Sequence, residues 1–356
     1  MHIKTLSSTK DMDVYIQHND VNLYYATNFN AVDLAFYVTE MNILIVPDME
    51  KERALKESKV EVKSFGDLGY HKLRKKMDSR DALAEMLIGF LKSHGVKKVG
   101  IPENFPAYLA LKLSNHFDVE ITNPFIKMRA IKSEREIEFI RDSSKAAILA
   151  FEFALKVLRR ERSCDRVRER IENYLYLKGY ITGTIVSSGE VSAIPHGSGG
   201  FVEDHVVVDV FPRSRRHRYY SDFTRTVIVR RNEKIEEMLN AVIEAQEKAI
   251  SIIRDGVKAK DVHNIVCDVL ESYGYGTLRR KSKEGFIHST GHGVGLEIHE
   301  EPRIFENDDT LRTGMVFTVE PGLYYKDVGG VRVEDVVVVK RDGCEVLTRY
   351  PKFVRI

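Results

Sequence analysis

The sequence predicts a two-domain protein, in which an α/β domain is followed by an α+β domain. Its 356 residues leave room for two hydrophobic cores. Over residues 1–125, short β-branched and aromatic runs alternate with amphipathic helical patterns. A helix-start motif at Ser133 then opens a second half, where long helices alternate with apolar strands that carry acids. We therefore expect domains at residues 1–125 and 126–356.

The first domain contains no stretch that combines histidines and acids at metal-ligand spacing. We expect strands at residues 13–17, 23–26, 35–38, 42–46 and 97–101, and helices at residues 79–93 and 106–117. Ser79 is the expected N-cap of the first of these helices. Without a candidate site of its own, this domain is expected to shape the substrate pocket or to form oligomer contacts.

The second domain begins with a capping box, Ser133-Glu134-Arg135-Glu136, which predicts a long helix running to Leu158. Further helices are expected at residues 165–178, 234–254 and 260–272. The arginines between Arg159 and Arg170 interleave with acids, which is typical of a solvated helix face with ion pairs four residues apart rather than of a nucleic-acid surface.

The segment HSTGHGVGLEIHE, residues 288–300, is the richest in candidate chemistry. It holds His288, His292 and His299, and imidazole is both a common metal ligand and a proton carrier near neutral pH. Glycines alternate around the middle histidine, and their lack of a side chain suits close approach of a ligand or of another strand. A lone histidine is usually structural, but three of them among glycines favour a site.

Three apolar stretches elsewhere each carry an acid in the middle of an expected strand. They are HVVVDVF with Asp209, VFTVEPG with Glu320, and VRVEDVVVVK with Glu334. Asp335 should point to the opposite face of its strand. An ionised carboxylate in an apolar strand costs several kcal/mol unless it is paired or bound to a cation. A shared cation explains the three acids together.

Composition narrows the choice of partners and compartment. Lys and Arg number 55 against 53 Asp and Glu, so neither nucleic acid nor an anionic membrane is required as a partner. The N-terminal segment MHIKTLSSTKDMD lacks the apolar core of a secretion signal, and no apolar run approaches the length of a spanning helix. The three cysteines are odd in number and far apart, which is unlike a disulfide framework. We expect a cytoplasmic protein.

Five stretches together resemble the pita-bread metallopeptidase family, specifically its two-domain Xaa-Pro dipeptidases (prolidases) and Xaa-Pro aminopeptidases. They are VVVDVF, YYSDFTRT, HSTGHGVGLEIHE, TVEPGLYY and GVRVEDVVVV, in family order. RAIKSEREIEFIR, residues 129–141, also resembles the start of the family's catalytic domain. The resemblance covers roughly residues 130–356, and residues 1–125 match the family's creatinase-like N-terminal domain only in size and general character.

The resemblance implies two divalent metal ions per subunit, held by Asp209, Asp222, His292, Glu320 and Glu334. Asp222 and Glu334 would bridge the ions. Four carboxylates and one imidazole form an oxygen-rich ligand set that suits Mn, Co or Zn, and five ligands are more than one tetrahedral centre needs.

The resemblance also implies a reaction in which a hydroxide bridging the two metals attacks a peptide carbonyl. Glu320 would be both ligand and proton acceptor, His299 would contact the substrate and stabilise the intermediate, and His196 would be a further active-site histidine. His288 would line the pocket for the residue after the scissile bond. The two supporting residues would be Thr224, orienting a ligand carboxylate, and Arg332, expected to support the bridging acid Glu334.

The sequence departs from the family pattern between the first two aspartates. Asp209 and Asp222 are 13 positions apart (222 − 209), and the extra residues form a basic loop at residues 213–218. A hairpin lengthened by an even number keeps both aspartates in the same alternation phase. The loop is expected to be a solvated turn; binding of a substrate carboxylate or of a partner subunit is the alternative.

The predicted function is hydrolysis of Xaa-Pro bonds in dipeptides or at the N-terminus of short peptides, by a homodimer that binds neither nucleic acid nor membrane. One alternative is an aminopeptidase of the same fold without a preference for proline. Another is a metal-free binding or scaffold protein, which would leave the acids in apolar strands unexplained.

Overall fold

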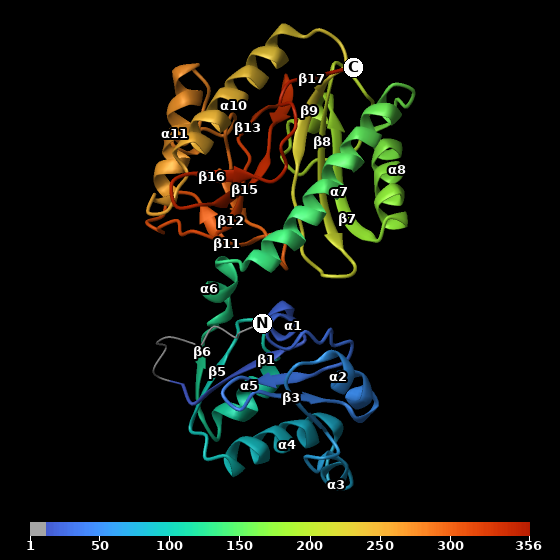
Figure 1. Ribbon diagram of the computed structural model, residues 1–356, viewed down its shortest axis with the longest axis vertical. Coiled ribbons are helices and arrows are strands. Elements are labelled where there is room, and N and C mark those ends of the chain that lie inside the picture. Colours follow the sequence, from blue (N-terminus) through green and yellow to red (C-terminus); the bar gives the residue numbers. More distant parts are fainter. Residues whose placement is uncertain (1–11) are drawn as a thin grey trace. The chain divides into compact units, whose positions relative to one another are not determined.

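The computed structural model describes residues 12–356 and forms two compact units (Figure 1). The first unit ends at Met128, and the second covers Arg129–Ile356. Residues 1–11 lie outside the described residues. They make up most of the N-terminal segment in which no secretion signal was expected. Within residues 12–356, no helix has both the length and the apolarity needed to cross a bilayer.

The first unit is built on a mixed six-stranded sheet with the order β4-β3-β2-β1-β5-β6. Strands β1, β2 and β3 are antiparallel neighbours, whereas the pairs β1–β5, β5–β6 and β3–β4 are parallel. Its strands are β1 (Val14–His18), β2 (Phe36–Val38), β3 (Ile43–Val46), β4 (Glu61–Ser64), β5 (Lys98–Ile101) and β6 (Asp118–Ile121). Its helices are α1 (Val21–Thr27), α2 (Lys51–Glu57), α3 (Tyr70–Arg74), α4 (Ser79–Ser93) and α5 (Ala107–Ser114), and η1 (Asp48–Glu50) is a short 3₁₀ turn. Helix α6 (Phe125–Ala130) begins in this unit and ends with the first two residues of the second.

One expected element of this unit is wrong: residues 23–26 were expected as a strand and lie in helix α1. The side chain of Asp20 accepts hydrogen bonds from the backbone N–H groups of Asn22 and Leu23, which starts a helix. Asn28 ends it in the left-handed conformation. The N-cap of α4 also differs, because the acceptor is Asp78 and not Ser79. In both cases the deciding residue is a capping aspartate just before the apolar run.

The second unit starts with α7 (Glu134–Leu158), and the expected capping box is confirmed. The hydroxyl of Ser133 accepts from the Glu136 N–H, and Glu136 Oε2 accepts from the Ser133 N–H at 2.8 Å. Its other helices are α8 (Cys164–Leu177), α9 (Gly189–Ser192), α10 (Glu233–Ile252) and α11 (Ala259–Ser272), with the 3₁₀ turn η2 (Leu278–Arg280).

The strands of this unit form sheets with the orders β17-β9-β8-β7, β11-β10-β12-β15-β16 and β13-β14. Their bounds are β7 (Tyr180–Ser188), β8 (His205–Ser214), β9 (Thr224–Ile228), β10 (Gly291–Gly293), β11 (Glu300–Ile304), β12 (Val316–Val319), β13 (Gly322–Tyr325), β14 (Gly329–Arg332), β15 (Asp335–Val339), β16 (Cys344–Val346) and β17 (Val354–Arg355).

Each of the two larger sheets is covered by its own pair of long helices (Figure 1). Helices α7 and α8 share a core with β8, in which Phe151 and Ile171 pack with Val208. Helices α10 and α11 share a second core with β12 and β15, in which Leu239 packs with Phe317 and Val337. The second unit is therefore α+β, with two helix-covered sheets whose strands supply the candidate site.

Glu334 does not lie in the middle of one continuous strand, as the sequence suggested. The chain pairs with β13 up to Arg332, breaks at Val333 and Glu334, and then pairs with β12 from Asp335. At the break, the N–H of Glu334 donates to the carbonyl of Thr224 at 3.0 Å. Because the chain changes strand partner here, Glu334 contacts Thr224 at the start of β9. The next residue, Asp335, forms an ion pair with Arg225, also on β9, at 2.9 Å.

Candidate metal centre

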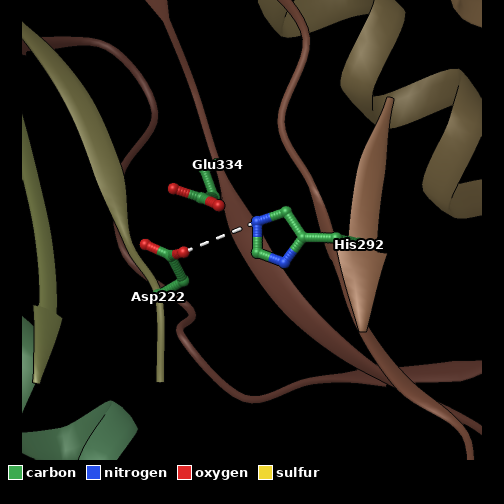
Figure 2. A group of neighbouring side chains, drawn as sticks. All are labelled: Asp222, His292 and Glu334. Atoms are coloured by element: carbon green, nitrogen blue, oxygen red, sulfur yellow. Dashed lines mark ion pairs between the residues drawn. The ribbon is translucent and has the colours of Figure 1, made fainter. Parts of the chain in front are cut away.

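Asp222, His292 and Glu334 converge from three segments that are far apart in the sequence (Figure 2). One ligand atom from each lies within 4.8 Å of the other two. Asp222 comes just before β9, His292 lies in β10, and Glu334 lies at the break between β14 and β15. The imidazole Nε2 of His292 is 3.7 Å from Asp222 Oδ2 and 3.3 Å from Glu320 Oε1. Asp222, His292 and Glu334 therefore face a common point, and Glu320 lies next to His292.

Thr318 orients two members of this group at once. Its hydroxyl donates to Glu320 Oε1 at 3.2 Å and accepts from the backbone N–H of His292 at 3.0 Å. Strand β12 ends at Val319, so Glu320 follows the strand rather than lying in its middle. Sequence reasoning missed Thr318, although its place two positions before Glu320 already put it on the same face of the strand.

The glycines of the histidine segment allow close approach of neighbouring strands. A Cβ on Gly291 would lie 1.8 Å from the carbonyl oxygen of Thr318, and one on Gly293 would lie 2.2 Å from that of Glu301. The sequence left open whether these glycines allow close approach of a ligand or of another strand. At Gly291 and Gly293 it is another strand that comes close.

Asp209, in the middle of β8, is the fifth predicted ligand, and Arg332 holds it. Arg332 Nη2 donates to Asp209 Oδ2 at 2.8 Å, while Asp209 Oδ1 is buried and accepts no hydrogen bond from the described residues. Arg332 was expected to support Glu334. Its direct carboxylate partner is Asp209, and it reaches Glu334 through Thr224, whose hydroxyl accepts from Arg332 Nε at 3.4 Å. Glu334 instead accepts from the hydroxyl of Thr224 at 2.6 Å, as the proposed orienting role of Thr224 requires.

Burial and mutual repulsion disfavour ionisation of the clustered acids. Burial raises the pKa of Asp222 and Glu334 well above the usual range, and the neighbouring carboxylates raise both further. Burial likewise raises the pKa of Glu320 to about 8, although Arg332 opposes the shift. Such shifts mark a pocket that holds more negative charge than its own cations balance.

Three further histidines surround this group. The ring of His299 meets that of His292 edge to face, with centroids 4.1 Å apart. His288 Nε2 lies 3.1 Å from the hydroxyl of Tyr324, which accepts from Arg332 Nη1 at 2.8 Å. Burial lowers the pKa of His288 to about 4, so the ring is neutral near pH 7.

His196 is exposed on the loop that follows α9. The carbonyl of the preceding Pro195 accepts from Arg332 Nη1 at 3.2 Å, which ties this loop to the same arginine. His196 is close enough to His288 and His299 for its charge to lower the pKa of each, although burial is the larger cause.

Tyr324 is the second residue that sequence reasoning missed, and it lies in the quoted motif TVEPGLYY.

The basic loop at residues 213–218 is only partly the solvated turn that was expected. Arg215 and Arg216 are exposed, but His217 is buried and stacks on Phe139 with centroids 4.7 Å apart. His217 Nε2 also lies 3.1 Å from Asp142 Oδ2. Both packing partners lie on α7, so the loop is anchored to that helix at its centre.

The residues present fit divalent cations. Asp209, Asp222, Glu320 and Glu334 carry four negative charges when ionised, and Arg332 supplies one positive charge, which leaves three uncompensated (4 − 1). Asp209 Oδ1 accepts no hydrogen bond from residues 12–356, so it is available to a cation. Oxygen-rich ligand sets of this kind suit hard or borderline divalent metals.

Comparison with known proteins agrees with this chemistry. Residues 138–341 match metallopeptidase family M24, and residues 2–131 match the creatinase/prolidase N-terminal domain. An Xaa-Pro dipeptidase of Pyrococcus horikoshii is 33% identical over 354 residues, covering 95% of this chain and 93% of that protein.

Two solved structures share the fold along nearly the whole chain. The prolidase from Pyrococcus horikoshii OT3 matches with a TM-score of 0.82 and 31% identity, covering 96% of this chain and 95% of that one. The X-Pro aminopeptidase from Thermotoga maritima MSB8 matches with a TM-score of 0.80 and 28% identity, covering 97% and 98%. The expected fold, a creatinase-like N-terminal domain followed by a pita-bread catalytic domain, is confirmed.

Proposed function

Because this chain belongs to metallopeptidase family M24, we propose that it hydrolyses the bond between any residue and proline in dipeptides or at the N-terminus of short peptides. The observation that carries the proposal is the convergence of Asp222, His292 and Glu334, with Glu320 beside them. The names of the relatives, an Xaa-Pro dipeptidase and a prolidase, support the choice of proline. A bond to proline lacks the N–H that ordinary proteases bind, so it needs a dedicated enzyme.

The site would hold two divalent ions, Mn, Co or Zn, through Asp209, Asp222, His292, Glu320 and Glu334. Two such ions bring four positive charges against the net three negative charges of the pocket, whereas one ion would leave it anionic. When bound, these ions supply the Lewis acidity that activates water and polarises the scissile carbonyl.

The remaining groups act on protons and on the substrate. Glu320 is the proposed proton acceptor, because its side chain is 16% exposed and can meet a substrate while Thr318 holds its Oε1. His299 and His196 are exposed next to the centre and would contact the substrate and the charge that develops on its carbonyl oxygen. His288, kept neutral and held by Tyr324, would line the pocket for proline.

A second candidate is an Xaa-Pro aminopeptidase, which the similarity to the Thermotoga maritima enzyme favours. The test is hydrolysis of Xaa-Pro, Xaa-Pro-Yaa and Xaa-Ala peptides by chelator-treated protein reloaded with Mn, Co or Zn. Cleavage of Xaa-Pro alone supports the dipeptidase, and cleavage of Xaa-Pro-Yaa supports the aminopeptidase. Equal cleavage of Xaa-Ala would contradict the preference for proline, and no cleavage by metal-loaded protein would favour a binding or scaffold role.

The setting of the enzyme is also proposed. We expect a homodimer in the cytoplasm, in which residues 1–125 shape the substrate pocket or form dimer contacts. Cys164, Cys267 and Cys344 are free thiols, which suits a reducing compartment. Light scattering of the purified protein would measure the oligomeric state, and a monomeric mass would contradict the dimer.

A further inference from the structure

The segment that begins the second unit is joined to the histidine segment by a group of charges, in which Arg129, Lys132 and Glu300 are buried and Glu297 is half exposed. Lys132 Nζ lies 2.8 Å from Glu300 Oε1, and Arg129 Nη2 pairs with Glu300 Oε2. Arg129 Nη2 also lies 2.7 Å from Glu297 Oε2. The side chains of Lys132, Arg129 and Glu300 are only 1%, 5% and 7% exposed, so the ion pairs of Glu300 with Lys132 and Arg129 are shielded from water.

The carboxylate of Glu300 also shapes the turn that contains His299. It accepts from the backbone N–H of Glu297 at 3.3 Å, and it lies where a Cβ on Gly295 would be, 2.3 Å from Oε1. The turn is closed by the N–H of Gly295, which donates to the Glu297 carbonyl at 3.1 Å. His299 immediately precedes Glu300, so its backbone is held between this turn and strand β11.

The two cationic residues, Arg129 and Lys132, are held by parts of the chain outside the histidine turn. Arg129 lies in the last part of α6, and Lys132 donates its backbone N–H to the carbonyl of Gly314 at 2.8 Å. Burial alone would raise the pKa of Glu300, but the charges of Lys132 and Arg129 outweigh it and lower that pKa. The carboxylate is therefore ionised near neutral pH, and both ion pairs persist.

We propose that Lys132 and Arg129 are positioning residues for His299, acting through Glu300. The ring of His299 meets the ring of the ligand His292 at 4.1 Å, where a small displacement of the turn changes what it can contact. A misplacement of about 1 Å can lower a rate by about 100-fold. The segment RAIKSE thus serves the active site as well as starting helix α7. This inference rests on the proposed catalytic role of His299.

The test is a double variant that removes one charge of each sign, Lys132→Met with Glu300→Gln, assayed on an Xaa-Pro dipeptide. The double variant keeps the group neutral, and Arg129 keeps Glu297 as its partner, so no buried ion is left unpaired at the cost of about 3–5 kcal/mol. We expect kcat to fall about 10-fold to 100-fold with little change in KM. Lys132→Arg, which keeps the charge, should retain most of the parent kcat.

The matched control is Arg141→Met with Glu345→Gln, which removes an ion pair between α7 and β16 that does not touch the histidine turn. Its kcat should equal that of the parent. A purely structural role for Glu300 predicts that both double variants lower the melting temperature and leave kcat of the folded protein unchanged; that result overturns the inference.

A readout independent of turnover is the NMR signal of His299 in protein labelled at histidine Cε1. We expect the signal to shift or broaden in the Lys132→Met/Glu300→Gln variant and to stay in place in the control. If the parent itself does not cleave Xaa-Pro peptides, the proposed function fails, and the NMR comparison still tests the positioning. An unchanged His299 signal in the variant contradicts the positioning even when the parent is active.

Discussion

Thr224 and Glu334 exchange two hydrogen bonds. The hydroxyl of Thr224 donates to Glu334 Oε2 at 2.6 Å, and the N–H of Glu334 donates to the Thr224 carbonyl at 3.0 Å. This pair joins the sheet of β8 and β9 to the break before β15, so it fixes one proposed ligand across both halves of the catalytic unit.

Thr224→Val should weaken metal binding. The substitution keeps the shape of the side chain but leaves Glu334 Oε2 without its donor, and loss of such a supporting contact typically costs about 10-fold to 100-fold in metal affinity. Titration calorimetry with Mn or Co measures the change. Thr348→Val is the matched control, because the buried Thr348 hydroxyl donates at 2.9 Å to Asp335, which is not one of the proposed ligands. Equal affinities of Thr224→Val and parent would contradict the role of the hydroxyl.

Arg332→Lys should lower activity although it keeps the charge. The guanidinium contacts Asp209, Tyr324 and the Pro195 carbonyl together, and a lysine ammonium cannot reach all three in that fork geometry. We expect kcat/KM to fall about 100-fold, which corresponds to roughly 2.7 kcal/mol. Steady-state kinetics on an Xaa-Pro dipeptide checks this, and near-parent kcat/KM would show that the multiple contacts are dispensable.

Glu320→Gln and His292→Ala should each nearly abolish turnover while the fold persists. Removal of a general base typically lowers the rate by roughly 10²–10⁴-fold, and His292→Ala also removes a proposed metal ligand. Circular dichroism should match the parent for both variants. Turnover close to the parent rate in a folded variant would contradict the role proposed for the substituted residue, proton acceptor for Glu320 or metal ligand for His292.

Removal of metal should destabilise the catalytic unit. Without cations, Arg332 is the one balancing charge that residues 12–356 bring to the four carboxylates. Bound ions stabilise the native state by about 2.7 kcal/mol at 100 times their dissociation constant. Differential scanning calorimetry of chelated and reloaded protein measures the shift in melting temperature. Identical melting of the two samples, with metal content verified, would argue against a metal centre here.

His205 should make stability depend on pH below neutrality. Burial lowers its pKa from 6.5 to about 4, and the ring accepts or donates one hydrogen bond with Ser192 at 3.0 Å. Between pH 6.5 and 4 the unfolded chain binds a proton that the native state does not, so the free energy of unfolding falls as the pH falls.

The slope from this one group is at most about 1.4 kcal/mol per pH unit. Urea unfolding of the parent and of His205→Gln at several pH values measures it, and the variant should show a shallower dependence. The same slope in both proteins would mean that His205 is not the titrating group.

Much of the site was predictable because metal ligands are limited to a few residue types, which are conspicuous in apolar or glycine-rich surroundings. Asp209, Glu320 and Glu334 stand out as acids in apolar stretches and His292 as a histidine among glycines, whereas Asp222 was named only through the family resemblance. The structure brings Asp222, His292 and Glu334 together. The long helix α7 was equally predictable from its capping box.

The errors arose where tertiary contacts decide local structure. Periodicity cannot reveal that the chain changes strand partner between Arg332 and Asp335, because both flanking segments read as strand. Nor can it show that Arg332 bonds Asp209 directly and reaches Glu334 only through Thr224, since that depends on how the sheets approach. Helix α1 was missed because a capping aspartate outweighed β-propensity over a short run.

The closeness of Gly291 to strand β12 has a consequence for anyone scanning this protein by mutation. A single methyl group at position 291 would overlap the Thr318 carbonyl oxygen, and Thr318 is the residue whose hydroxyl holds both Glu320 and the His292 amide. Gly291→Ala would therefore be recorded as an inactivating change at a position that has no reactive group. Loss of activity at this glycine would reflect displacement of its neighbours, and ranking residues by such losses alone would mistake it for part of the chemistry.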